Sequence, residues 1–183
     1  MCIKNDKNIV LIGMSAVGKT KVGKLLAEQM NLSYIDEDDY FEEQNGLIHV
    51  VRNELSDEDY KNKERLVRKH IKGLSNHIIS AGGQFGMSDE IDDVNGIKIQ
   101  LKPSTNDILK KYKKLSEDKT SASNLRRKLV FKSPSEIKKQ IKIRNKKFKS
   151  KANIILDTTG LRKEEIAKLV IKTLIQIGYV KKD

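Results

Sequence analysis

Short apolar runs alternate along this chain with longer stretches in which apolar residues recur every three or four positions. Short runs bounded by turn residues are typical of buried strands, and the wider spacing is typical of helices with one buried face. Their alternation predicts an α/β fold built on a parallel sheet. The runs that we interpret as strands are residues 8–12, 33–36, 77–81, 97–101 and 153–157.

The helical stretches carry their own boundary signals. Ser56, followed three residues later by Asp59, has the spacing of an N-terminal capping pair, so a helix should begin there. The last helix should place Leu174 and Ile177 on one buried face and end at Gly178. These signals predict helices between the strands, as a parallel sheet requires.

Residues 13–20 read GMSAVGKT and stand directly after the apolar run 8–12 and before a helical stretch. The pattern is G-x-x-x-x-G-K-[ST], the phosphate-binding loop or P-loop, in its expected strand–loop–helix context. Its backbone N–H groups and the lysine bind phosphate oxygens, and the hydroxyl of the last residue is placed to bind Mg²⁺. The sequence therefore predicts a nucleoside triphosphate site. Its residues are Gly13, Ser15, Ala16, Val17, Gly18, Lys19 and Thr20.

An acidic segment follows the second predicted strand, where residues 36–39 read Asp-Glu-Asp-Asp. Ligands of open α/β sheets bind at the carboxyl ends of the strands, so these carboxylates should face the nucleotide. Asp36 is a candidate to hold Mg²⁺ through water, and Asp38 to orient or deprotonate an acceptor hydroxyl. Glu37 and Asp39 are explained by the first turn of a helix, where acidic residues are favoured.

Three later features are open to two interpretations each. Gly82 and Gly83 follow a predicted strand, so they either admit a ligand to the backbone or form a plain tight turn. The polar segment 113–135 is either a lid, with Arg127 reaching the transferred phosphate, or a solvated loop. We favour the lid. Arg144 lies in a basic helical stretch and by itself would be surface charge.

The composition of the chain limits which classes of protein it can belong to. The 183 residues, 37% hydrophobic, suit one domain spanning residues 1–183, and no apolar stretch approaches the length of a membrane span. The net charge of +12 comes almost entirely from dispersed lysines, which favours a solvated basic surface over a nucleic-acid interface. One cysteine, Cys2, fits a reducing compartment. We therefore expect a cytoplasmic protein, and a monomer.

These pieces, in this order, resemble the shikimate kinase family over about residues 8–178. The resemblance implies a three-layer α/β/α P-loop kinase with a five-stranded parallel sheet and a lid segment. It also implies ATP and Mg²⁺ as cosubstrate and cofactor, and phosphorylation of the 3-hydroxyl of shikimate. The segments that carry the resemblance read NIVLIGMSAVGKTKVGKLLAEQM, YIDEDDYFEEQNG, DEDYKNKE, ISAGGQF, SNLRRKL and IRNKKFKSKANIILDT.

The same resemblance implies roles for particular residues. Lys19, Asp38 and Arg127 would be catalytic, and Arg127 would also contact the nucleotide. Thr20 and Asp36 would serve the metal ion. Shikimate would be bound by Asp38, Lys61, Gly82, Gly83 and Arg144.

Several positions depart from the family pattern. Lys61 replaces an arginine, and a lysine lacks the planar fork that binds a carboxylate with two hydrogen bonds. Gln84 replaces a third glycine, Ala16 a loop glycine and Lys128 a lid proline. The nucleotide half is thus intact and the acceptor half altered. Two alternatives stay open, a kinase for another small anionic acceptor and a nucleotide-binding protein that has lost phosphotransfer.

Overall fold

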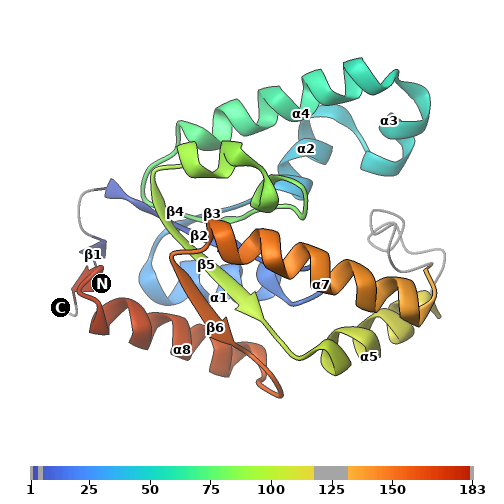
Figure 1. Ribbon diagram of the computed structural model, residues 1–183. Coiled ribbons are helices and arrows are strands. Elements are labelled where there is room, and N and C mark those ends of the chain that lie inside the picture. Colours follow the sequence, from blue (N-terminus) through green and yellow to red (C-terminus); the bar gives the residue numbers. More distant parts are fainter. Residues whose placement is uncertain (1, 4–5, 118–131, 182–183) are drawn as a thin grey trace.

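The computed structural model describes residues 2–3, 6–117 and 132–181 (Figure 1). A five-stranded sheet at its centre has the strand order β3-β4-β2-β5-β6, with every neighbouring pair parallel. All five predicted strands are confirmed, and their ends differ from the prediction by at most one residue. The strands are β2 Asn8–Ile12, β3 Ser33–Asp36, β4 His77–Ser80, β5 Gly96–Lys102 and β6 Ile154–Asp157.

Helices cover both faces of this sheet. Helices α1 and α8 pack together on one face, and α7 crosses the other (Figure 1). Helices α2, α3 and α4 form a separate group that follows the edge strand β3. The architecture is therefore the three-layer α/β/α arrangement that the resemblance implies. The helices are α1 Lys19–Met30, α2 Glu37–Asn45, α3 Ile48–Glu54, α4 Asp57–Lys72, α5 Thr105–Ser116, α7 Pro134–Lys151 and α8 Lys163–Gln176, with short 3₁₀ turns η2 Phe85–Met87 and η3 Asp89–Asp93.

Local capping explains where several helices begin. The Ser56 hydroxyl accepts a hydrogen bond from the Asp59 backbone N–H at 3.1 Å, as the spacing predicts. A full capping box, Ser133 with Glu136, opens α7. At the end of α8 the prediction is only partly right. Gly178 adopts a φ of +66° just after the helix, but the Ile177 side chain is 53% exposed instead of buried.

A second, two-stranded sheet was not foreseen from the sequence. Strand β1, Cys2–Ile3, pairs antiparallel with β7, Val180–Lys181, so the two ends of the chain lie side by side (Figure 1). Pairs of two residues carry too little periodicity to be recognised in a sequence.

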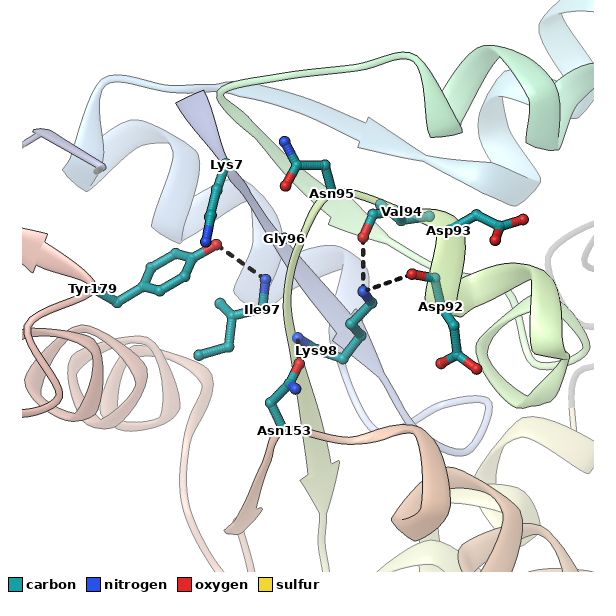
Figure 2. A pocket seen from close by; sticks show the side chains of 10 residues that line it. All are labelled: Lys7, Asp92, Asp93, Val94, Asn95, Gly96, Ile97, Lys98, Asn153 and Tyr179. Atoms are coloured by element: carbon teal, nitrogen blue, oxygen red, sulfur yellow. Dashed lines mark hydrogen bonds between the residues drawn. The ribbon is translucent and has the colours of Figure 1, made fainter. Parts of the chain in front are cut away.

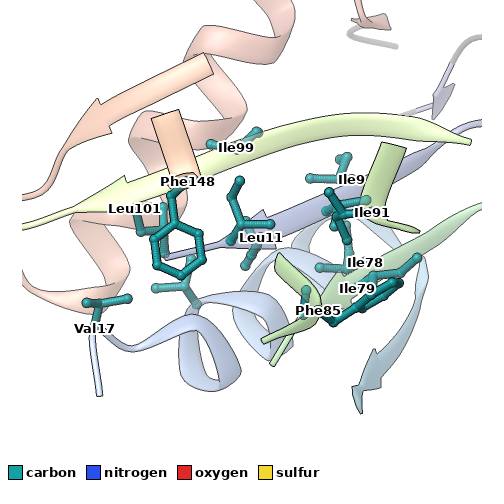
Figure 3. Close-up of a cluster of buried hydrophobic side chains, with 14 of the residues drawn as sticks. Ile9, Leu11, Val17, Ile78, Ile79, Phe85, Ile91, Ile99, Leu101 and Phe148 are labelled. Atoms are coloured by element: carbon teal, nitrogen blue, oxygen red, sulfur yellow. The ribbon is translucent and has the colours of Figure 1, made fainter. Parts of the chain in front are cut away.

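The core is centred on β2, whose apolar side chains are fully buried. Figure 3 shows Leu11 of β2 among side chains from both neighbouring strands and from α7, including Phe148. At the start of β2 the buried Asn8 side chain donates to the carbonyls of Leu74 and Asn95, at 2.6 and 2.8 Å. It also accepts from the His77 backbone N–H at 2.9 Å. Asn8 thus fixes three neighbouring segments at the amino ends of the strands.

Polar groups that line a shallow pocket near the start of β5 form hydrogen bonds with one another (Figure 2). The Lys98 ammonium donates to the carbonyls of Val94 and Asp92, at 2.7 and 3.4 Å. Burial lowers the pKa of Lys98. The Tyr179 hydroxyl accepts from the Ile97 backbone N–H at 3.0 Å. Because these groups already have partners in the chain, we interpret the pocket as structural.

The Asn8 contacts predict a large effect on stability. Asn8→Ala removes three hydrogen bonds and leaves the Leu74 carbonyl and the His77 N–H without this partner, while the Asn95 carbonyl keeps its bond from the Asn8 backbone N–H. The loss should lower the free energy of unfolding by about 2 kcal/mol. Asn53→Ala, on an exposed position of α3, is the control and should change it by less than about 0.5 kcal/mol. Urea denaturation of the two variants measures the difference. Equal effects would contradict the role given to Asn8.

Candidate active site

A cleft with a volume of about 800 Å³ lies at the carboxyl ends of β2, β3 and β4. The P-loop forms one wall, and the amino end of α2 and the turn after β4 lie beside it. Helices α3, α4, α5 and α7 each contribute side chains to the lining. This is where ligands bind in open parallel sheets, because the strand order reverses at β2.

The P-loop conformation depends on its small residues. Gly13 has a φ of +140°, and a Cβ there would lie 2.7 Å from the Leu101 carbonyl oxygen, so no larger residue fits. Gly18 has a φ of +103°, and Ala16 adopts the left-handed region with a φ of +66°. Where the family has glycine, Ala16 accepts this conformation at a cost on the order of 1 kcal/mol.

The predicted nucleotide-binding residues divide into two groups. Gly13 packs against β5, and the Val17 side chain belongs to the core, so neither lines the cleft. The Lys19 ammonium donates to the carbonyls of Gly13 and Met14 at 3.0 and 3.1 Å, which holds it across the loop. The members that line the cleft are Ser15, Ala16, Gly18, Lys19 and Thr20.

Asp36, the last residue of β3, joins the P-loop to the acidic segment. Its carboxylate accepts hydrogen bonds from the Thr20 hydroxyl at 2.8 Å and from the Asp38 backbone N–H at 3.1 Å. The Tyr34 hydroxyl lies 3.2 Å from the same carboxylate. A hydroxyl and a carboxylate side by side are hard oxygen ligands, which suit Mg²⁺ when phosphates and waters complete its shell. The residues present therefore fit that ion.

Asp38 and the two glycines come together in the cleft as the sequence suggests. A Cβ on Gly82 would lie 2.9 Å from the Asp38 carboxylate, so the turn after β4 passes directly beside this side chain. A Cβ on Gly83 would lie 3.5 Å from a guanidinium nitrogen of Arg144 and 3.6 Å from the Ser15 hydroxyl. Arg144 reaches this position from α7, and all of these residues line the cleft.

Glu37 has a structural role that sequence reasoning missed. Its carboxylate accepts from the Gly82 backbone N–H at 2.7 Å and from Arg68 Nε at 3.1 Å. Arg68 also contacts Glu90 at 3.0 Å and Glu64 at 3.6 Å. Burial raises the pKa of Glu37 to about 7, although Arg68 and the Gly82 N–H act in the opposite direction. This network fixes the glycine turn to α2 and α4.

Lys61 does not take the position that the resemblance implies. It is exposed on α4 and is not among the residues that line the cleft. Arg52, which the sequence analysis did not single out, lines the cleft from α3. Its Nη2 donates to the Tyr60 hydroxyl at 2.8 Å, and its guanidinium lies 4.5 Å from the centre of the Tyr60 ring. No local sequence signal distinguished Arg52, because helix α3 itself was not recognised.

The predicted lid is only partly described. Arg126, Arg127 and Lys128 lie outside the described residues. Of segment 113–135, the first residues complete α5 and the last begin α7.

Besides Lys19, four lysines line the cleft, and a positively charged wall suits a polyphosphate. They are Lys21, Lys111, Lys114 and Lys163. Their role was not anticipated, because dispersed lysines resemble ordinary surface charge in a sequence.

Three features of the cleft define a P-loop kinase. They are a P-loop at the carboxyl end of the central strand, a hydroxyl–carboxylate pair fit for Mg²⁺ and a second carboxylate in the same cleft. The chain belongs to the shikimate kinase family, since the model of the family described as "Shikimate kinase" matches residues 15–175. It is accordingly an ATP-dependent phosphotransferase that acts on a hydroxyl group. Among the helices of the described ranges, none is sufficiently long and apolar to cross a membrane.

Individual relatives agree with this assignment. The chain is 29% identical over 170 residues to a shikimate kinase of Thermodesulfovibrio yellowstonii, covering 91% of this chain and 94% of the relative. It is 26% identical over 178 residues to one of Haemophilus influenzae, covering 93% and 92%. A structure of Acinetobacter baumannii shikimate kinase in complex with shikimate has a TM-score of 0.80 at 20% identity, with 97% of each chain covered. At that identity the structural likeness supports the fold.

The close approach at Gly82 predicts that Gly82 tolerates a side chain less well than Gly83 does. A Cβ on Gly82 would also lie 2.6 Å from a Glu37 carboxylate oxygen, whereas at Gly83 the nearest atoms lie at ordinary contact distance. Gly82→Ala should therefore lower the free energy of unfolding by about 1–3 kcal/mol, a drop in Tm of several degrees. Gly83→Ala is the matched control and should shift Tm by less. Calorimetry measures both, and a reversed order would contradict the geometry.

The raised pKa of Glu37 predicts a pH dependence of stability. Its ordinary value is 4.5, so between about pH 5 and pH 7 the folded protein holds a proton that the unfolded chain has lost. The free energy of unfolding should therefore fall across this range as pH rises. Relative to Glu37→Gln, which lacks the titrating group, the fall should be about 2–3 kcal/mol.

The measurement is chemical denaturation of the wild type and of Glu37→Gln at a series of pH values. Glu90→Gln is the control, because it also removes a carboxylate from Arg68 but at a partly exposed position. A difference between wild type and Glu37→Gln that stays constant from pH 5 to pH 7.5 would show that Glu37 is ionised throughout.

Proposed function

We propose that the protein transfers the γ-phosphoryl group of ATP to the 3-hydroxyl of shikimate, with Mg²⁺ as cofactor. One observation carries the proposal. The P-loop, Asp38 and Arg144 line one continuous cleft, which gives donor phosphates, an acceptor hydroxyl and an acceptor carboxylate a common cavity. Membership in the shikimate kinase family supports this choice of acceptor.

On the donor side, the chain's work is to hold phosphates and balance their charge. Lys19 exchanges its contacts with the loop carbonyls for the β- and γ-phosphates, and the loop N–H groups bind the remaining oxygens. Thr20 and Asp36 would hold Mg²⁺, which would supply positive charge to neutralise the phosphates. The cleft lysines add to the positive field around the nucleotide.

On the acceptor side, Asp38 accepts a hydrogen bond from the 3-hydroxyl and takes its proton. The hydroxyl oxygen then bonds to the γ-phosphorus as the bond to the bridging oxygen of ADP breaks. Arg144 pairs with the acceptor carboxylate, and the backbone at Gly82 and Gly83, which carries no side chains, allows the cyclohexene ring of shikimate to approach. Arg127 closes over the phosphates in this proposal, from a segment beyond the described residues.

The protein would act as a monomer in the cytoplasm. Apart from Arg127, which lies outside the described residues, the residues given a role here all line the cleft of a single chain. A single cysteine suits a reducing compartment, which is also where ATP is available.

A second candidate acceptor class remains worth testing. Gln84 lines the cleft where the family has glycine, and Lys61 lies outside it, so the acceptor end differs from the family pattern. ADP release should be measured with shikimate and with a panel of other polyol acids and nucleoside monophosphates. Turnover of shikimate above every other compound supports the proposal. If shikimate is not turned over but another compound is, that compound would replace shikimate as the proposed acceptor.

The proposed roles predict distinct kinetic losses. Lys19→Met should abolish ADP release with the fold intact, because the phosphates lose their principal positive charge. Asp38→Asn should lower kcat by about 10²- to 10⁴-fold with little change in the KM for ATP. Lys172→Met, exposed on α8, is the control for Lys19 and should match the wild type. Unchanged turnover in Lys19→Met would rule out this mechanism.

A further inference from the structure

The described part of the cleft is lined by three arginines, Arg52, Arg68 and Arg144. Arg68 is engaged by carboxylates on all sides, because its nitrogens face Glu37, Glu64 and Glu90 at 3.0–3.6 Å. Its charge is therefore compensated within the protein. Arg52 and Arg144 form no ion pair with a carboxylate among the described residues. They are the two cleft guanidiniums that can each receive an external anion.

Arg52 is held in a defined orientation. Its Nη2 donates to the Tyr60 hydroxyl, and its planar group lies over the Tyr60 ring at 4.5 Å. Tyr60 is buried and packs against Phe41 of α2 at a ring distance of 5.4 Å. The tyrosine hydroxyl uses only one of the five N–H donors of Arg52. The remaining donors keep the fork that binds a carboxylate with two hydrogen bonds.

The position of Arg52 also relates it to the reacting end of the cleft. Asp38 lies in the first turn of α2, and Phe41, one turn further along the same helix, supports Tyr60. Helix α2 thus carries the proposed base and, through Tyr60, also fixes Arg52. Asp38, Arg52 and Arg144 line the same cleft, so an acceptor whose hydroxyl meets Asp38 can present its carboxylate to these two arginines.

We propose that Arg52 is a carboxylate-binding, specificity-determining residue of this chain and takes the place that the family pattern would give to Lys61. The inference rests on the proposed function. Lys61 is exposed outside the cleft, so the chain supplies its second guanidinium from α3 instead of α4. Arginine is required at this position, because a lysine would stack poorly on Tyr60 and offer a single point charge.

The test compares Arg52→Gln with the matched control Lys61→Gln, using shikimate and its neutral methyl ester as acceptors. In Arg52→Gln the KM for shikimate should rise about 10- to 100-fold, while the KM for ATP stays within twofold. The preference of the enzyme for shikimate over the ester should fall by a similar factor, because that preference depends on the carboxylate. In Lys61→Gln both quantities should stay within twofold of the wild type.

Two further variants separate charge from packing. Arg52→Lys keeps the charge without the fork, and Tyr60→Phe keeps the ring without the hydroxyl, so both should raise the KM for shikimate by less than Arg52→Gln does. They also provide the readout if Arg52→Gln fails to fold, which thermal melting and binding of an ATP analogue would reveal. Unchanged KM values in both would then overturn the inference.

The outcomes distinguish this inference from the proposed function. If the wild type fails to phosphorylate shikimate, the proposed function is wrong and the inference falls with it. If the wild type phosphorylates shikimate but Arg52→Gln keeps its KM and its preference over the ester, only the inference is overturned. A rise in KM in Lys61→Gln without one in Arg52→Gln would return the role to Lys61.

Discussion

The hydrogen bond from Thr20 to Asp36, 2.8 Å long, joins the two halves of the cleft. Thr20 belongs to the first turn of α1, directly after the P-loop, and Asp36 ends β3 and caps α2. Because β3 and β2 are parallel strands of one sheet with β4 between them, their carboxyl ends emerge at the same edge. The phosphate-binding loop and the helix that carries Asp38 are thereby held in fixed positions relative to each other.

The acceptor end depends on a second, buried polar contact. Glu37 fixes the Gly82 turn to α2, and Arg68 ties the same carboxylate to α4. Breaking this buried contact would be costly, since the Gly82 N–H and the Arg68 guanidinium would each lose their acceptor. Arg68 is consequently a structural residue, and in our proposal the anionic acceptor is bound by Arg144 and Arg52.

Much of this arrangement could be predicted because its signals are local. Buried strands, capping residues and the P-loop each occupy a short stretch of sequence. The rule that ligands bind at the carboxyl edge then places Asp36, Asp38 and Gly82 near the P-loop. Glu37, Arg68 and Arg52 could not be assigned in this way. Their roles depend on how α2, α3 and α4 pack together, and helix-start acidity or surface charge explains each of them equally well in a sequence. The position of Lys61 was inferred from a motif whose arginine this chain lacks.

A crystal structure with Mg²⁺, a non-hydrolysable ATP analogue and shikimate would show directly how the acceptor binds. We expect the 3-hydroxyl within hydrogen-bond distance of Asp38 and pointing at the γ-phosphate, and the carboxylate between Arg52 and Arg144. A shikimate carboxylate bound to Lys61, or a ring turned so that another hydroxyl faces Asp38, would rule out the proposed binding mode.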